Sequence, residues 1–235
     1  MIGISDPKQR PPEARLLAPI ANEFAAAIRL FGANHRGVFW SSAEGQLERF
    51  RQLAGIFDQA DMAGGVSIND LGCGYGALFE FFADHPALQG GRYAGFDITP
   101  EMIAAAQSRI TDPRTRFQCA CRPDAPADYA FVSGTFNLRV DVPDDEWADF
   151  IRKGLLDLAT TSRKGIAFNM LQTERNGRRP KEAGSLYYSR PEPFFDFCRR
   201  ALSEDVTLVQ GYGLPEWTLL VRFGDSPLPH VTVGA

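Results

Sequence analysis

Hydrophobic and polar residues follow two different periods along the chain, and the change of period marks the predicted elements. Short apolar runs predict buried strands at 66–71, 92–97, 115–120, 128–133, 164–171, 204–211 and 216–223. Between most of them, apolar residues recur every three or four positions and predict helices at 76–84, 100–110, about 144–160 and about 192–201. This alternation is typical of a mostly parallel sheet with helices on both faces.

The last two predicted strands break the alternation. No helical pattern separates 204–211 from 216–223, and the connection runs through Gly211 and Pro215. We therefore expect an antiparallel hairpin at the edge of the sheet. The predicted fold class is α/β, a doubly wound, mostly parallel seven-stranded sheet of Rossmann-like type that ends in this hairpin.

Two helical patterns precede the first strand. The first covers 12–31 and ends at Gly32, and the second covers about 43–60 and begins after Ser41 or Ser42, either of which can cap it. We expect residues 1–63 to form an N-terminal helical cap or lid and residues 64–235 to form the main domain. Whether the first helix packs on the core or closes over a ligand stays open.

The first predicted strand of the sheet runs directly into a glycine-rich turn. Gly72, Gly74 and Gly76 stand at alternate positions, and Asp70 precedes the first of them by two residues. Glycine is needed where the backbone adopts a positive φ or where a ligand lies against the main chain. A strand, such a turn and a helix N-terminus together form a cradle for a nucleotide cofactor. The turn alone also satisfies the dinucleotide-binding pattern through Gly72, Gly74 and Ala77.

The second predicted strand ends in another acid, Asp97. A carboxylate at that strand end can accept hydrogen bonds from both hydroxyls of a ribose. Thr99 and Pro100 follow it and are typical of a helix start, with Thr99 as the N-cap and Pro100 at the first helical position.

The glycine turn and the two acids in this order resemble the class I S-adenosylmethionine-dependent methyltransferases. The resemblance covers about residues 64 to 222 and implies a Rossmann-like methyltransferase fold, S-adenosyl-L-methionine as cofactor and methyl transfer as activity. Two alternatives stay open: an NAD(P)-dependent Rossmann oxidoreductase, and a protein that binds the cofactor without transferring its methyl group. The C-terminal hairpin and the acid before the glycines favour the methyltransferase.

The resemblance also implies which residues hold the cofactor. Asp70 holds its amino end, the amides of the glycine turn approach its methionyl and ribose parts, and Asp97 takes the ribose hydroxyls. The segment after the third strand contacts the adenine edge, although it lacks the family's usual acid or amide and offers only backbone groups. The implied set is Asp70, Gly72, Cys73, Gly74, Gly76, Asp97, Ile98, Met102, Ala120 and Cys121.

Polar side chains follow the fourth and fifth predicted strands, where ligands of open α/β sheets bind. Ser133, Asn137 and Arg139 follow the fourth strand and Asn169 ends the fifth. We place Ser133 with the cofactor-binding residues and name Asn137 and Arg139 as candidate catalytic residues. Turn formation is an equally good explanation of Asn137 and Asn169. The Asn/Asp-Pro-Pro-aromatic motif of nucleobase-methylating relatives is missing at this point, which favours oxygen as the methylated atom.

A second group of candidates lies before the sheet. His35 titrates near neutral pH and is a candidate general base, and Trp40 can cover the sulfonium of the cofactor by a cation–π contact. A loop histidine and a core tryptophan are the alternatives. Gln46 and Arg49 lie one helical turn apart and either face the cofactor carboxylate or belong to a solvated helix face.

A basic loop follows the fifth strand at 173–190. Its cations are Arg175, Arg178, Arg179, Lys181 and Arg190. We interpret the loop as a substrate lid that favours an anionic group on the methyl acceptor, with a solvated loop as the alternative. Tyr187 and Tyr188 add aromatic surface, and Tyr188 joins the candidate catalytic residues.

Composition limits the class of partner. The net charge of −4 disfavours a broad nucleic-acid surface, although an RNA methyltransferase that uses the basic loop remains an alternative. No apolar run reaches the roughly 20 residues of a membrane span, and no secretory signal is visible. The four cysteines match no zinc pattern and are interpreted as free thiols. We expect a cytoplasmic monomer or homodimer that binds no metal and methylates a small molecule.

Overall fold

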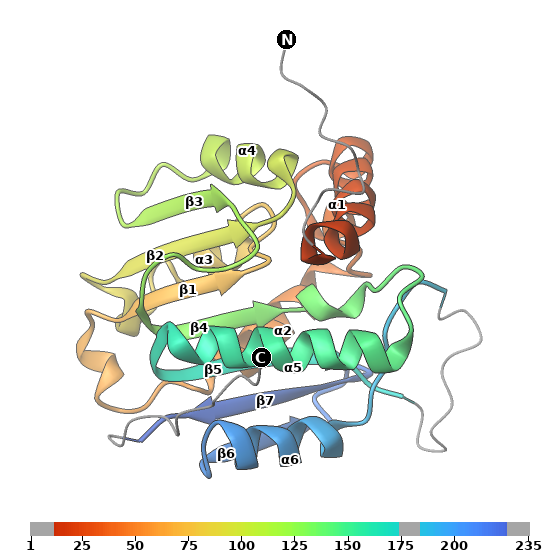
Figure 1. Ribbon diagram of the computed structural model, residues 1–235. Coiled ribbons are helices and arrows are strands. Elements are labelled where there is room, and N and C mark those ends of the chain that lie inside the picture. The colour runs from red at the N-terminus through yellow and green to blue at the C-terminus, as the bar shows by residue number, and fades with distance from the viewer. Residues whose placement is uncertain (1–11, 174–183, 225–235) are drawn as a thin grey trace.

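The computed structural model describes residues 12–173 and 184–224 and contains one seven-stranded sheet (Figure 1). The strand order is β3-β2-β1-β4-β5-β7-β6, and the first five of these strands run parallel. The strands are β1 Ser67–Leu71, β2 Arg92–Asp97, β3 Thr115–Cys119, β4 Ala127–Ser133, β5 Ser162–Leu171, β6 Val206–Gln210 and β7 Glu216–Arg222. The predicted fold class is confirmed, including the C-terminal hairpin.

The register brings the carboxyl ends of four strands to one edge of the sheet. Leu71 of β1 lies opposite Phe96 of β2, and Ser133 at the end of β4 lies opposite Asn169 of β5. Strand β7 runs antiparallel between β5 and β6, so its first residue, Glu216, lies opposite the last residue of β5. Side chains from both sequence halves therefore meet at this edge.

Helices cover both faces of the sheet. The helices are α1 Pro12–Phe31, α2 Ala43–Ala54, α3 Ala77–Phe82, α4 Pro100–Arg109, α5 Asp144–Thr160 and α6 Pro191–Ala201. On one face α5 and α6 pack on β4, β5 and β7 (Figure 1). On the other face α2 packs on β4, β5 and β7, α3 lies beside α2, and α4 packs on β2 and β3. Helix α1 packs beside α4 and sends Ile20 into the core of the α5 face.

Most predicted boundaries agree with the structure to within two residues. Helix α2 is the main exception, because it ends at Ala54 and not near residue 60. Gly55 follows as its C-cap, yet Ile56 is fully buried in the core and Phe57 packs against it, so the apolar pattern continues beyond the helix. The division at residue 63 stays a prediction. Within the described ranges, no helix has the length and apolar character needed to cross a membrane.

Candidate functional site

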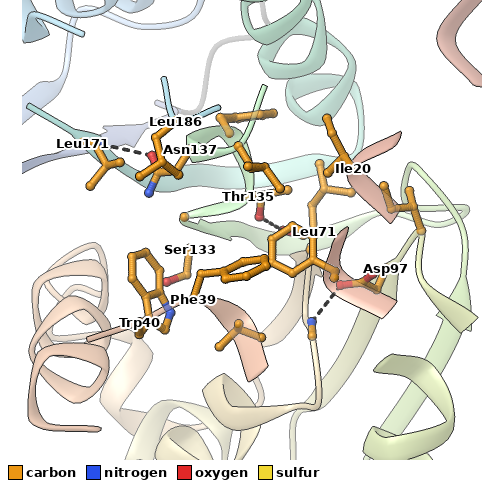
Figure 2. Close-up of a pocket in the computed structure, with 18 of the residues that line it drawn as sticks. Ile20, Phe39, Trp40, Leu71, Asp97, Ser133, Thr135, Asn137, Leu171 and Leu186 are labelled. Carbon is orange, nitrogen blue, oxygen red and sulfur yellow. Dashed lines mark hydrogen bonds between the residues drawn. The ribbon is translucent and has the colours of Figure 1, made fainter. Parts of the chain in front are cut away.

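A cavity of about 280 Å³ lies at the carboxyl edge of the sheet. It is lined by the loops after β1, β2, β3 and β4, by α1, by residues 38–41, by α5 and by the start of β7 (Figure 2). Nine of the predicted cofactor residues lie on its wall: Trp40, Gly72, Gly74, Asp97, Ile98, Met102, Ala120, Cys121 and Ser133. The glycine turn, the second acid and the segment after β3 are thus brought together.

The glycine turn follows β1 with three residues at positive φ, at Gly72, Gly74 and Gly76. The amide of Gly72 donates to the carbonyl of Phe96, which ties the turn to β2. A Cβ on Gly72 would overlap the side chain of Thr135. A larger residue would therefore both strain the backbone and fill the cavity wall.

Asp97 fixes the turn and the start of the next helix at the same time. Its Oδ2 accepts from the amide of Gly74 at 3.0 Å (Figure 2). Its Oδ1 accepts from the amide of Thr99 at 2.8 Å. Burial raises the pKa of Asp97, and the two amide hydrogen bonds act in the opposite direction. Thr99 occupies the N-cap position of α4 as expected, but its side chain makes no capping bond.

Asp70 is buried below the turn and has one free oxygen. Its Oδ2 accepts from the hydroxyl of Tyr93, whereas its Oδ1 has no hydrogen-bond partner. Burial raises the pKa of Asp70 to about 7. The residue lines a second cavity of about 40 Å³ that adjoins the first and also contacts Cys73 and Gln46. A cationic group that reached this cavity would meet an unpaired carboxylate oxygen.

The other end of the main cavity has a polar floor, which consists of Arg49, Ser133, Asn137 and Glu216. Asn169 does not line the cavity but supports Glu216 from behind the floor. Arg49 donates from Nε and Nη2 to the carboxylate of Glu216, and both side chains are almost fully buried. Asn169 donates to Glu216 at 2.8 Å and accepts from the amide of Gly134 at 2.9 Å. Arg49 is 4% exposed, so the alternative of a solvated helix face is wrong.

Trp40 lies between this floor and the cofactor-side turn. The guanidinium of Arg49 lies over its ring at 3.7 Å from the ring centroid, and a Cβ on Gly134 would overlap the ring atoms Cζ2 and Cη2. The chain turns into the cavity at Phe39, which has a φ of 61°. A left-handed conformation costs a residue other than glycine about 1–2 kcal/mol, and this strained turn was not predicted. Phe39 itself lines the cavity and contacts Phe24.

The remaining wall is apolar. It is formed by aliphatic and aromatic side chains of α1, α5 and the loops after β4 and β5, among them Ile20, Leu138, Trp147, Leu171 and Leu186. Trp147 donates its indole N–H to the carbonyl of Phe136, so its polar atom is not offered to the cavity.

Several predicted site residues lie elsewhere. His35, Arg139 and Tyr188 do not line the main cavity, and Arg139 instead donates to two backbone carbonyls and pairs with Asp144 at 3.0 Å. Gly76 lies under the turn, where a Cβ would overlap Ile110. Four cations of the basic loop fall outside the described residues: Arg175, Arg178, Arg179 and Lys181.

Sequence reasoning missed Glu216 and left Arg49 open. The available signal was a carboxylate in an otherwise apolar strand, together with an arginine on the apolar side of a helix. In the described part of the chain, no three His, Cys, Asp or Glu side chains group as metal ligands do. The four cysteines are free, and Cys73 and Cys198 are buried.

Comparison with known proteins agrees with this geometry. A family model described as a methyltransferase domain matches residues 68–154. The protein named "Putative methyltransferase Rv1506c" of Mycobacterium tuberculosis is 42% identical over 157 residues, which cover 66% of this chain and 92% of that protein. The chain belongs to the class I S-adenosylmethionine-dependent methyltransferases.

Solved methyltransferases share the fold at low sequence identity. The 1,6-didemethyltoxoflavin-N1-methyltransferase of Burkholderia thailandensis has a TM-score of 0.56 at 19% identity, with 88% of this chain and 91% of that chain covered. The magnesium protoporphyrin IX methyltransferase of Synechocystis has a TM-score of 0.54 at 16% identity, with 77% and 81% covered. Both were crystallised with S-adenosylmethionine or its demethylated product. The protein is thus an enzyme of the methyltransferase class, and its cofactor is S-adenosylmethionine.

The cavity fits this cofactor by its own chemistry. Gly72 and Gly74 bring main chain without side chains to the cavity wall, and Asp97 offers a carboxylate beside that turn. The unpaired oxygen of Asp70 matches the ammonium of a methionyl group. The glycine turn, Asp97 and Asp70 all lie in the part of the chain that the structure describes.

Proposed function

We propose that this methyltransferase transfers the methyl group to an oxygen of a small molecule that has a largely apolar body. The observation that carries the proposal is the division of one cavity into a cofactor-side turn, an apolar wall and a polar floor. A ligand pocket that is mostly apolar with a few placed polar groups is typical of small-molecule binding. The mostly apolar wall of the cavity disfavours a polyanionic acceptor such as RNA.

We assign the cofactor to the side of β1 and β2. Asp70 would bind its ammonium, the amides around Gly72 and Gly74 its methionyl and ribose parts, and Asp97 its ribose hydroxyls. Ile98 and Met102 would flank the adenine, with the backbone of Ala120 and Cys121 at its edge. When bound, S-adenosylmethionine supplies a methyl group that is already activated for displacement.

The described residues then have to orient the methyl acceptor and exclude water. On the described wall of the main cavity, the carboxylate of Glu216 is already bound to Arg49 and Asn169, and no histidine is present. A methyl acceptor whose oxygen is ionised at neutral pH, such as a carboxylate or an acidic phenol, needs no general base. This supports an anionic acceptor independently of the basic loop after β5.

The relatives in the comparison leave the methylated atom open. The Burkholderia enzyme is named as an N1-methyltransferase and was crystallised with 1,6-didemethyltoxoflavin. At this low sequence identity, the structural likeness supports the fold only, and the substrate of that enzyme is not transferred to this chain. Oxygen is therefore proposed from the lack of a free base on the described cavity wall.

The test uses S-adenosylmethionine that carries a ¹³C-labelled methyl group. The protein is incubated with a panel of aromatic carboxylic acids, phenols and the corresponding amines, and the products are analysed by ¹³C NMR, which separates O-methyl, N-methyl and C-methyl groups. We expect label in O-methyl signals, and less label with Asp97→Asn when the cofactor is limiting. Label in N-methyl or C-methyl signals alone would refute oxygen as the methylated atom.

A further inference from the structure

We propose that Arg49 and Asn137 determine the specificity for the methyl acceptor by donating hydrogen bonds to an oxygen at its polar end, a carboxylate or a carbonyl. This inference rests on the proposed function and adds the residues and the chemical class that they select. It concerns the polar floor and not the cofactor side of the cavity.

The amide group of Asn137 has a fixed orientation and a free donor. Its Oδ1 accepts from the amide of Leu171 at 3.1 Å, so its Nδ2 must face the other way. Figure 2 shows this nitrogen on the side of Trp40 and Ser133. The residue is 5% exposed and its Nδ2 has no partner. Its backbone is held by hydrogen bonds to Gly134 and Tyr187, which prevents the side chain from moving away.

Arg49 offers a second free donor of the same kind. Its Nε and Nη2 bind Glu216, and its Nη1 has no hydrogen-bond partner although the side chain is buried. Stacking on Trp40 at 3.7 Å fixes the plane of the guanidinium. A buried donor without a partner costs free energy unless a ligand satisfies it.

Both residues line the main cavity and are connected through Trp40 and Gly134. A Cβ on Gly134 would lie 3.4 Å from Nδ2 of Asn137 and would overlap the ring of Trp40, on which Arg49 stacks. Asn169 links Gly134 to Glu216, so the same hydrogen-bond network positions both donors. Ser133 adds an unpartnered hydroxyl next to them.

The chemistry of this region selects against a cationic group. Glu216 balances the charge of Arg49, and its two oxygens already accept hydrogen bonds from Arg49 and Asn169. An ammonium would therefore meet donors and a guanidinium, whereas a carboxylate or carbonyl oxygen would satisfy both free donors. The apolar wall accommodates the rest of such a molecule.

The experiment uses protein saturated with S-adenosylhomocysteine and three probes of one size: 2-naphthoate, 2-acetylnaphthalene and 2-naphthylmethylamine. Affinities are measured by titration calorimetry or ligand-observed NMR. We expect at least one of the two oxygen probes to bind at least tenfold more tightly than the amine, and the better of the two identifies the oxygen as carboxylate or carbonyl. Equal affinities, tighter binding of the amine, or no binding of any probe would overturn the proposal.

Asn137→Asp is the diagnostic variant. It keeps an oxygen for the amide of Leu171 and replaces the free donor with a carboxylate oxygen, so affinity for the oxygen probes should fall at least tenfold. Gln210→Glu is the control, because it makes the same change in an exposed side chain at the end of β6 outside the cavity. If Asn137→Asp does not fold, the double variant Arg49→Met/Glu216→Met removes the other donor at similar volume. An unchanged preference in the folded variants refutes the role of these residues.

Two further measurements separate this inference from the proposed function. Affinity for S-adenosylhomocysteine is determined first on each protein and should be the same in wild type and Asn137→Asp. The position of the labelled methyl group tests oxygen methylation without reference to the floor. Retained cofactor binding with no oxygen preference would remove the inference and leave the proposed function standing.

Discussion

The buried ion pair between Arg49 and Glu216 gives a stability prediction of large size. Replacing Arg49 by Met leaves the carboxylate of Glu216 with no cation in a site that is fully buried, with Asn169 as its remaining side-chain donor. Breaking a buried pair by removing one partner typically costs about 3–5 kcal/mol. Side-chain exposures of 5% and 0% give no reason to reduce this range for solvent screening. Glu216→Met should cost a similar amount.

The double variant Arg49→Met/Glu216→Met should recover most of that loss. It removes both charges and fills the space with apolar side chains, a change that is often neutral or stabilising by about 1–4 kcal/mol. The coupling energy from the four proteins should therefore be on the order of 3 kcal/mol or more. Asn169 loses one partner in the double variant, which offsets part of the recovery.

Urea denaturation followed by far-ultraviolet circular dichroism measures these free energies without using the fluorescence of Trp40, which contacts Arg49. The matched control is the exposed pair of Arg116 and Asp124, whose side chains are 47% and 50% accessible. Such pairs contribute about 0–1 kcal/mol. Our reasoning is refuted if the buried single variants cost no more than Arg116→Met, or if their costs simply add in the double variant.

Three further predictions concern the cofactor side and the turn after β4. Asp97→Asn removes the charge and leaves one acceptor for the two amides of Gly74 and Thr99. Because loss of a hydrogen bond to a charged group costs about 1.5–3 kcal/mol, affinity for S-adenosylhomocysteine should fall about 10- to 100-fold in calorimetry. An unchanged affinity contradicts the ribose assignment. Burial raises the pKa of Asp70 to about 7, so the folded protein keeps a proton that the unfolded chain loses near pH 4. The free energy of unfolding should therefore fall as pH rises between about 4 and 7. Affinity for S-adenosylhomocysteine should rise through pH 7, because its ammonium favours the ionised carboxylate of Asp70. Both trends should weaken in Asp70→Asn, and an affinity that is flat between about pH 6 and 8 argues against the assignment. Gly134→Ala places a residue other than glycine at a φ of 71° and displaces Trp40. The strain of about 1–3 kcal/mol should lower the melting temperature by several degrees. An unaltered melting temperature means that the ring of Trp40 moves freely.

The order of the elements was predictable because each has a strong local pattern. Strand β2 and helix α5 have the predicted bounds, since charged or turn residues mark both ends. The end of α2 was not predictable from periodicity, because Ile56 and Phe57 keep the apolar spacing after the helix has ended. A residue after a helix can enter the core through tertiary packing that the sequence pattern does not distinguish from another turn.

The cofactor side was more predictable than the methyl-acceptor side for a physical reason. Asp70, Gly72 and Asp97 lie on consecutive strands, so local order is enough to bring them together. The pairing of Arg49 with Glu216 joins residues that are 167 positions apart. It depends on the insertion of β7 beside β5, which the sequence does not specify to the residue. Local pattern also gave no sign of the positive φ at Phe39 that turns Trp40 into the cavity.

The late position of Glu216 in the chain has a consequence for synthesis. Until β7 docks beside β5, the guanidinium of Arg49 on α2 has no counter-ion in its native position. A nascent chain that has emerged only through β5 already contains every residue assigned to the cofactor, yet its methyl-acceptor chamber is unfinished. Assembly of the enzyme therefore ends with the segment that completes substrate recognition. A shortened protein that lacks β6 and β7 should not recognise the methyl acceptor.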